Sequence, residues 1–136
     1  MSAVDVALPR LQTEEGFRAL PYLDTNGLGT IGFGFCYTRG ISRRAAAALL
    51  REQAQELHEQ LLAYSWYASL DDVRQSACLD IAVNEGLGGL LKFPRMIAAL
   101  SRQDWPSAAT ECHVEDSKLA GRYAALAKLI LAGGAK

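Results

Sequence analysis

The sequence predicts an α+β fold in which a small N-terminal β-hairpin lobe packs on a mainly helical C-terminal lobe, with a groove between the two. Three observations lead to this prediction: a turn signal between two short apolar stretches, a run of strong helix formers after them, and helical spacing of apolar residues beyond. A chain of 136 residues is expected to form one domain. We assign residues 16–40 to the hairpin lobe and residues 1–15 and 41–136 to the helical lobe.

The first predicted element is a helix from Leu8 to Glu15. Pro9 suits the first helical position, where its missing N–H group costs nothing, and Gly16 is a helix stop. Leu8, Leu11 and Glu15 follow the spacing i, i+3, i+7, so Glu15 is expected on the apolar face of this helix.

A hairpin follows the helix, with strands at 18–23 and 28–35 joined by the turn signal Asp24-Thr25-Asn26-Gly27. The second strand alternates apolar residues with small ones. Ile31, Phe33 and Phe35 fall on one face, and Thr30, Gly32 and Gly34 on the other. Glycine weakens a strand, so two glycines on one face suggest that a ligand approaches the backbone closely.

The remainder is predicted to be helical. The expected helices cover residues 43–64, 72–84, 93–101, 105–112 and 119–131, and Gly86-Leu87-Gly88-Gly89 is expected to be a break.

Composition excludes several classes of function. The formal net charge of −1 gives no general attraction to nucleic acid, and no stretch is apolar enough for membrane insertion. The three cysteines and two histidines have no metal-binding spacing, so neither a metal nor another cofactor is expected, and Cys78 is assigned to the core. The first 16 residues lack the pattern of a signal peptide, which favours synthesis and folding in the cytoplasm.

Glu15 and Asp24 are candidates for cleaving a glycosidic bond, which requires one carboxylic acid and one carboxylate. A helix C-terminus and an apolar face both favour the protonated form of Glu15, whereas Glu14 is expected to face solvent. Asp24 lies at a solvated turn, and the Thr30 hydroxyl across the hairpin could hold a water molecule beside it. Each residue alone also has an ordinary interpretation, as a surface acid, a turn residue and a strand threonine.

The pattern E-G-F-R-x-x-x-Y-x-D-T-x-G-x-x-T-I-G-x-G resembles the phage-type lysozymes, the muramidases of T-even phage endolysins and their relatives. Their motif is a Glu, an Asp nine residues later and a Thr six residues after that, which matches Glu15, Asp24 and Thr30. The segment LDDVRQSACLDIAVNEG is similar to the central helix of the family, and Arg122 matches a late family arginine.

This resemblance implies a lysozyme-like fold and an enzyme that cleaves the β-1,4 bond between N-acetylmuramic acid and N-acetylglucosamine in peptidoglycan. It implies that Glu15 is the general acid, that Asp24 acts on the opposite side of the sugar and that Thr30 positions the water in an inverting reaction. Further residues are implied to bind the glycan or to lie beside the acid: Gly32, Gly34, Asn84 and Gly86 as substrate-binding residues, and Arg122 as the electrostatic partner of Glu15. No metal is needed.

The resemblance also implies how the protein works in its setting. It would be a monomer made in the cytoplasm of a bacterial host, acting on the cell wall with peptidoglycan glycan strands as its partner. With no signal peptide, access to the wall would require a holin or a delivery machine. The sequence departs from the family in two ways: Phe35 stands where relatives have His, and a shortened segment after Thr30 suggests that the usual third strand is trimmed.

Three other interpretations remain open at this stage. A lysozyme-fold module could bind glycans, or pack in a phage tail, without cleaving; loss of a catalytic residue would be its signature. A lytic transglycosylase would use the acid but leave an anhydro sugar, so product masses separate it from a hydrolase. A plain helical interaction domain would explain the second half of the chain and leave the hairpin unexplained.

Overall fold

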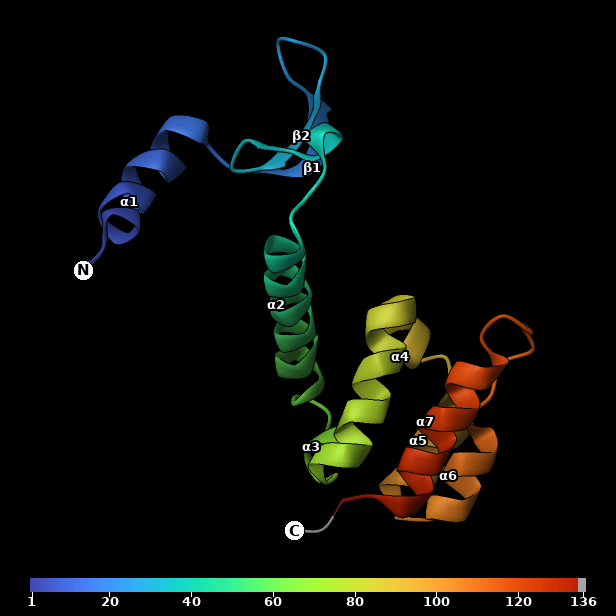
Figure 1. Ribbon diagram of the computed structural model, residues 1–136. Helices are drawn as coiled ribbons and strands as arrows, with labels where there is room; N and C mark the ends of the chain where they lie inside the picture. The colour runs from blue at the N-terminus through green and yellow to red at the C-terminus, as the bar shows by residue number, and fades with distance from the viewer. Residues whose placement is uncertain (135–136) are drawn as a thin grey trace. The chain divides into compact units, whose positions relative to one another are not determined.

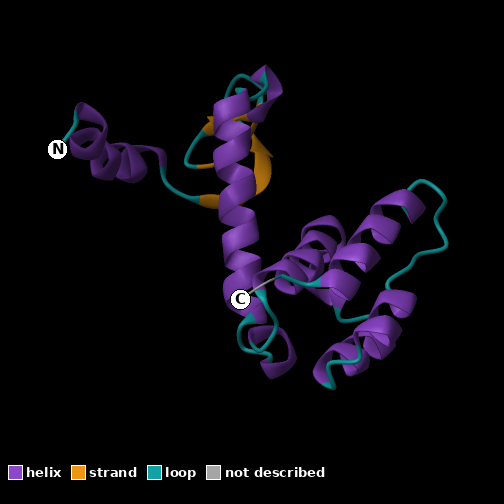
Figure 2. Ribbon diagram, turned by 60° about the horizontal axis from the view of Figure 1, so that its bottom comes forward, coloured by secondary structure: helices purple, strands orange, loops and turns teal. Residues whose placement is uncertain are grey.

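The computed structural model describes residues 1–134 and divides the chain into two compact units, Met1–Ala48 and Leu49–Lys136 (Figure 1). The described residues form seven α-helices and one three-stranded antiparallel sheet. Figure 2 shows that all strands (orange) belong to the first unit, whereas the second unit is built from helices (purple). The predicted α+β class is therefore confirmed.

Helix α1 (Ala3–Glu15) begins earlier than the sequence predicted. The Ser2 hydroxyl accepts a hydrogen bond from the Asp5 N–H, and the Asp5 carboxylate accepts one from the Ser2 N–H, which makes a capping box. Pro9 consequently lies inside the helix, and its assignment to the first helical position is wrong. Gly16 ends the helix as predicted, with a φ of 67°. No residue of α1 is buried, so the apolar stripe expected on this helix is not buried.

The sheet has the order β1-β2-β3, with β1 at Arg18–Leu23, β2 at Gly29–Gly32 and β3 at Phe35–Cys36. A second strand running to residue 35 was therefore a wrong prediction. The third strand, which the sequence suggested is trimmed, is present with two residues. Gly32 and Gly34 have φ values of 70° and 76°, and these left-handed conformations turn the chain between β2 and β3. A short 3₁₀ helix, η1 (Tyr37–Arg39), follows.

Helix α2 (Arg43–Leu61) begins in the first unit and ends in the second. It stops three residues short of the predicted end at 64, and a short helix that the sequence did not predict, α3 (Ser65–Ala68), comes next.

The second unit is completed by α4 (Asp72–Leu90), α5 (Pro94–Ser101), α6 (Trp105–Glu111) and α7 (Ala120–Ala132). Gly86, with a φ of 79°, kinks α4, but residues 87–90 are helical again, so the open break expected at 86–89 is only a kink. In Figure 1, α7 (red) runs beside α4, and both contribute to one core. The largest fully buried side chains of this core are Leu61, Tyr67, Cys78, Ile81, Leu90, Met96, Leu100, Tyr123 and Ile130.

Arg74 is a buried cation that joins α4 to the end of α7. Its guanidinium forms a 2.8 Å salt bridge with Asp71 and donates hydrogen bonds to the carbonyls of Ile130 at 2.7 Å and Leu131 at 3.2 Å. It also lies over the Trp105 ring, 3.6 Å from the ring centroid. The last carbonyls of a helix lack partners within the helix, so Arg74 both caps α7 and neutralises the partly buried Asp71.

We expect Arg74→Ala to lower the free energy of unfolding by about 3 kcal/mol, because it removes a buried guanidinium and leaves the nearly covered Asp71 carboxylate without its cation. Urea denaturation monitored by circular dichroism measures this. The matched control is Arg102→Ala, which breaks an exposed pair with Asp104 and should cost less than about 1 kcal/mol. Equal losses in the two variants would contradict the role assigned to Arg74.

We also expect the second unit to lose stability between about pH 9 and pH 12. Burial raises the pKa of Cys112 to about 11 and, with smaller contributions from neighbouring groups, raises the pKa values of Cys78, Tyr67 and Tyr123 to about 12. Unfolded cysteine and tyrosine release their protons from pH 9 and 10 onward, where the folded groups still hold theirs. The contribution of these groups to the free energy of unfolding is therefore fully present below pH 9 and is lost as pH rises toward 12. Urea denaturation at a series of pH values measures this loss. A flat profile through this range would contradict the prediction.

Candidate active site

Glu15, the predicted acid, lies at the last position of α1 beside the turn that joins β2 to β3. Its carboxyl group packs against the backbone of Gly34 so closely that a Cβ atom there would overlap Oε2 and lie 3.0 Å from Cδ. Phe17, two residues after the end of α1, contacts Phe33 of the same turn, with ring centroids 5.4 Å apart. The Glu15 carboxyl therefore lies against the turn between β2 and β3, in space that is free because residue 34 has no side chain.

Asp24 and Thr30 are brought together through the backbone of one residue, Leu28. The Asp24 Oδ1 atom accepts hydrogen bonds from the N–H groups of Leu28 at 2.9 Å and Asn26 at 2.8 Å. The Leu28 carbonyl in turn accepts from the Asp24 N–H and from the Thr30 hydroxyl, both at 2.9 Å. These bonds orient the carboxyl group and the hydroxyl relative to one another. The residue paired with Thr30 across the hairpin is Tyr22, and not Asp24 as the sequence predicted.

The glycines of this hairpin have conformational and packing roles of their own. Gly29 is buried, because the Tyr37 ring occupies the space that a side chain would fill. Gly32 has open space around its α-carbon, so its positive φ is the feature that requires glycine. Gly32 and Gly34 do not form a bare strand face as predicted, because the strand ends at Gly32; their contact with a sugar stays a prediction.

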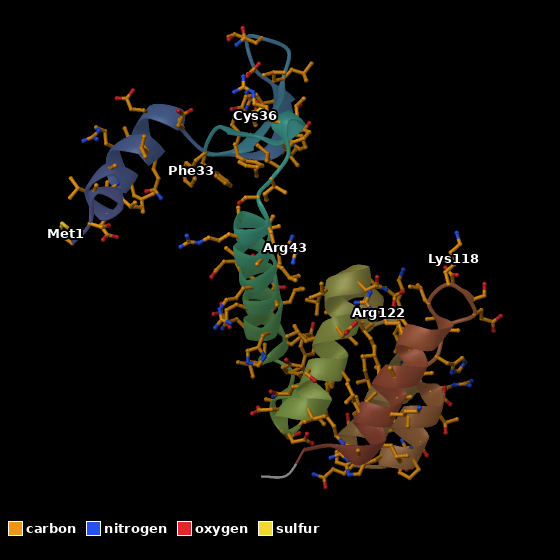
Figure 3. The ribbon with its side chains drawn as sticks, viewed as in Figure 1. Met1, Phe33, Cys36, Arg43, Lys118 and Arg122 are labelled. Atoms are coloured by element: carbon orange, nitrogen blue, oxygen red, sulfur yellow. The ribbon has the colours of Figure 1, made fainter. Side chains whose placement is uncertain are left out.

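In the second unit, Asn84 of α4 and Arg122 of α7 are both exposed and form a hydrogen bond with each other. Arg122 is labelled in Figure 3. Arg122 pairs with Asp80 through Nε at 2.7 Å and Nη2 at 2.5 Å, and its Nη1 donates to Asn84 Oδ1 at 3.3 Å. The arginine therefore has an anionic partner one helical turn before Asn84. Its predicted pairing with Glu15, which belongs to the other unit, stays a prediction.

A groove of about 290 Å³ lies between α2 and α4 of the second unit and reaches Gly86. Carboxamide and carboxylate groups alternate with apolar side chains along it, a lining that suits a ligand with both polar edges and apolar faces, such as a sugar. The lining residues are Gln53, Glu56, Leu57, Gln60, Ala82, Val83 and Gly86.

Among residues 1–134, no three side chains of His, Cys, Asp or Glu lie close enough together to hold a metal ion. None of the helices described is both long and apolar enough to cross a membrane.

Sequence reasoning missed the groups that support the predicted residues. Asp80 could have been found, because it lies four residues before Asn84 and therefore on the same helix face. The contact between Glu15 and Gly34, and the hydrogen bond from Tyr123 to Glu85, join residues far apart in the chain and carry no local signal.

Comparison with protein families places this geometry in context. The family described as phage lysozyme matches residues 12–128, a range that contains every predicted site residue. The chain belongs to the phage lysozyme family. Phage lysozymes are glycosidases that degrade peptidoglycan, and the match covers the Glu15, Asp24 and Thr30 that the sequence singled out. A search of curated proteins found no match.

We expect Gly34→Ala to reduce turnover on the order of 10²-fold, because the added methyl group displaces the Glu15 carboxyl. Its matched control is Gly40→Ala, at another positive φ (86°) with open space around it. Both variants should lose about 1–2 kcal/mol of stability through backbone strain, but Gly40→Ala should keep its turnover. Release of reducing ends from purified peptidoglycan gives the rate; equal rates in the two variants would argue against the placement of Glu15.

Proposed function

We propose that the protein is a muramidase that hydrolyses the β-1,4 bond between N-acetylmuramic acid and N-acetylglucosamine and so lyses bacterial cell walls. The observation that supports this most strongly is the ordered pair of Asp24 and Thr30, in a chain of the phage lysozyme family that also retains Glu15. A general acid, a carboxylate and a hydroxyl are the groups that direct hydrolysis of a glycoside requires.

Glu15 is the proposed general acid. It is exposed at the end of α1, where its carboxyl can reach a bound glycan, and Gly34 restricts its position. It donates its proton to the glycosidic oxygen as the bond to the departing sugar breaks.

Asp24 and Thr30 are proposed to hold the attacking water. The only hydrogen of the Thr30 hydroxyl is donated to the Leu28 carbonyl, so the Thr30 oxygen can only accept a further hydrogen bond. The Asp24 carboxylate likewise only accepts, and its Oδ2 has no partner among the residues that the structure describes. A water that donates to both groups directs a lone pair away from them, toward the anomeric carbon. Attack from the face opposite the acid inverts that centre, and the proton that the water loses as its oxygen bonds to the anomeric carbon passes to the Asp24 carboxylate.

The glycan strands of peptidoglycan are the proposed partner of the second unit as well. Asn84 supplies an exposed carboxamide, and Gly86 borders a groove with amide-rich walls. We further propose that the protein acts as a monomer and reaches the wall through a holin or a delivery machine.

The test compares Glu15→Gln with Glu14→Gln, which changes the adjacent acid and alters the net charge equally. We expect Glu15→Gln to reduce hydrolysis of purified peptidoglycan by at least about 10²-fold, because the amide has no acidic proton to donate. Glu14→Gln should retain wild-type turnover. Circular dichroism melting curves check that both variants fold.

Product masses decide the reaction type. Muropeptides with new reducing ends, formed by the wild type and Glu14→Gln but not by Glu15→Gln, are the expected result. Anhydro products, lighter by one water molecule, would identify a lytic transglycosylase. No cleavage by folded wild-type protein would leave a glycan-binding module in place of the enzyme.

A further inference from the structure

A directed chain of hydrogen bonds runs from Asn84 to Tyr123 and on to Glu85. Asn84 Nδ2 lies 3.4 Å from the Tyr123 hydroxyl oxygen, and that hydroxyl forms a short hydrogen bond with Glu85 Oε2. The Tyr123 side chain is buried, whereas Asn84 and Glu85 are exposed. None of the proposed roles above involves Tyr123 or Glu85.

The direction of this chain is fixed by the groups at its two ends. The guanidinium of Arg122 can only donate, so the Asn84 oxygen must face Arg122 and the Asn84 nitrogen must face Tyr123. The Asn84 nitrogen also only donates, so the Tyr123 oxygen accepts from it. The Tyr123 hydrogen is then free for the Glu85 carboxylate, which only accepts. Successive bonds of one direction polarise and strengthen one another.

The rest of the neighbourhood holds the ends of this chain in place. The Asp80 carboxylate binds two nitrogen atoms of the Arg122 guanidinium, Nε and Nη2. Glu85 precedes the kink at Gly86, and its Cβ lies so close to the backbone of Gly89 that only glycine fits there. The Tyr123 ring is stacked on Phe93. The hydroxyl group therefore has little freedom to move away from its partners.

We propose that Tyr123 and Glu85 are positioning residues that hold the Asn84 carboxamide in one orientation for hydrogen bonding to the N-acetyl group of a glycan. This inference rests on the proposed function. Once Arg122 and Tyr123 are satisfied, Asn84 retains one N–H and one oxygen lone pair. An acetamido group presents the complementary carbonyl and N–H, so a fixed carboxamide can make two hydrogen bonds with it, whereas a rotating one cannot hold both.

The first test observes the Asn84 carboxamide directly in ¹⁵N–¹H NMR spectra of the full chain without glycan. The protein has only two asparagines, Asn26 and Asn84, so the exposed Asn26 is an internal reference. Tyr123→Phe keeps the stacked ring and removes the hydroxyl. We expect it to move the Asn84 side-chain resonances toward those of Asn26.

Three further variants complete this test. Tyr67→Phe removes another buried hydroxyl, the one bonded to His58 at 2.7 Å, and should leave the Asn84 resonances unchanged. Glu85→Gln keeps an acceptor for Tyr123 and should preserve the wild-type resonances, whereas Glu85→Ala should reproduce the effect of Tyr123→Phe. Unchanged Asn84 resonances in Tyr123→Phe would overturn the proposal and leave a purely structural link between α4 and α7.

The second test measures binding of tri-N-acetylchitotriose by titration, and KM and kcat on peptidoglycan. In Tyr123→Phe the Asn84 carboxamide loses its fixed orientation. This should raise Kd for the trisaccharide and KM for peptidoglycan roughly three- to tenfold, whereas kcat should change less than about twofold. If the Asn84 resonances move in Tyr123→Phe but Kd for the trisaccharide does not change, the proposed role of Asn84 in binding the glycan is overturned. If the wild type binds the trisaccharide without cleaving peptidoglycan, the proposed hydrolase fails while Kd still tests the positioning pair. If the wild type binds no trisaccharide, the positioning proposal is overturned.

Discussion

Left-handed backbone at glycine is the constraint on which the first unit depends. Gly16 ends α1 immediately after Glu15, and Gly32 and Gly34 turn the chain between β2 and β3, all with positive φ. A residue with a Cβ atom is strained in these conformations, and at Gly34 it would also collide with Glu15. The abundance of glycine in this stretch is therefore explained by chain reversal and by the space that one carboxyl group needs, before any glycan is considered.

The second unit depends instead on polar contacts between two helices that also share an apolar core. Arg74 binds the C-terminal carbonyls of α7, and nearer the kink of α4 the Asp80–Arg122 pair and the Tyr123–Glu85 hydrogen bond join the same two helices. Arg74 is nearly enclosed, so its contacts contribute to stability. The Asp80–Arg122 pair is far more exposed and contributes less to stability, which favours a role in orienting surface groups.

The sequence predicts the helices of the second unit well because long amphipathic runs and capping residues such as Asp71 are local signals. It predicts the candidate site through motif spacing, which names Glu15, Asp24 and Thr30 but not what holds them. Two errors share one cause: strict alternation suggested a long strand through Gly32 and Gly34, and helix rules placed Pro9 first. In both cases a second local feature outweighed the pattern. Glycines with positive φ end the strand at Gly32, and the capping box at Ser2 starts the helix before Pro9.

Phe35 stands where relatives have histidine, and the structure shows which part of this residue the fold uses. Phe35 opens β3 and faces Ile31 in an antiparallel ladder, which is held by main-chain hydrogen bonds rather than by side chains. The Phe35 side chain is 42% exposed, and it is not among the contacts that order Glu15, Asp24 or Thr30. Replacement of the usual histidine is therefore compatible with an intact sheet. The groups proposed for chemistry are ordered by contacts with Leu28 and Gly34, two residues that both precede Phe35 in the chain, so their geometry does not require a titratable side chain at position 35.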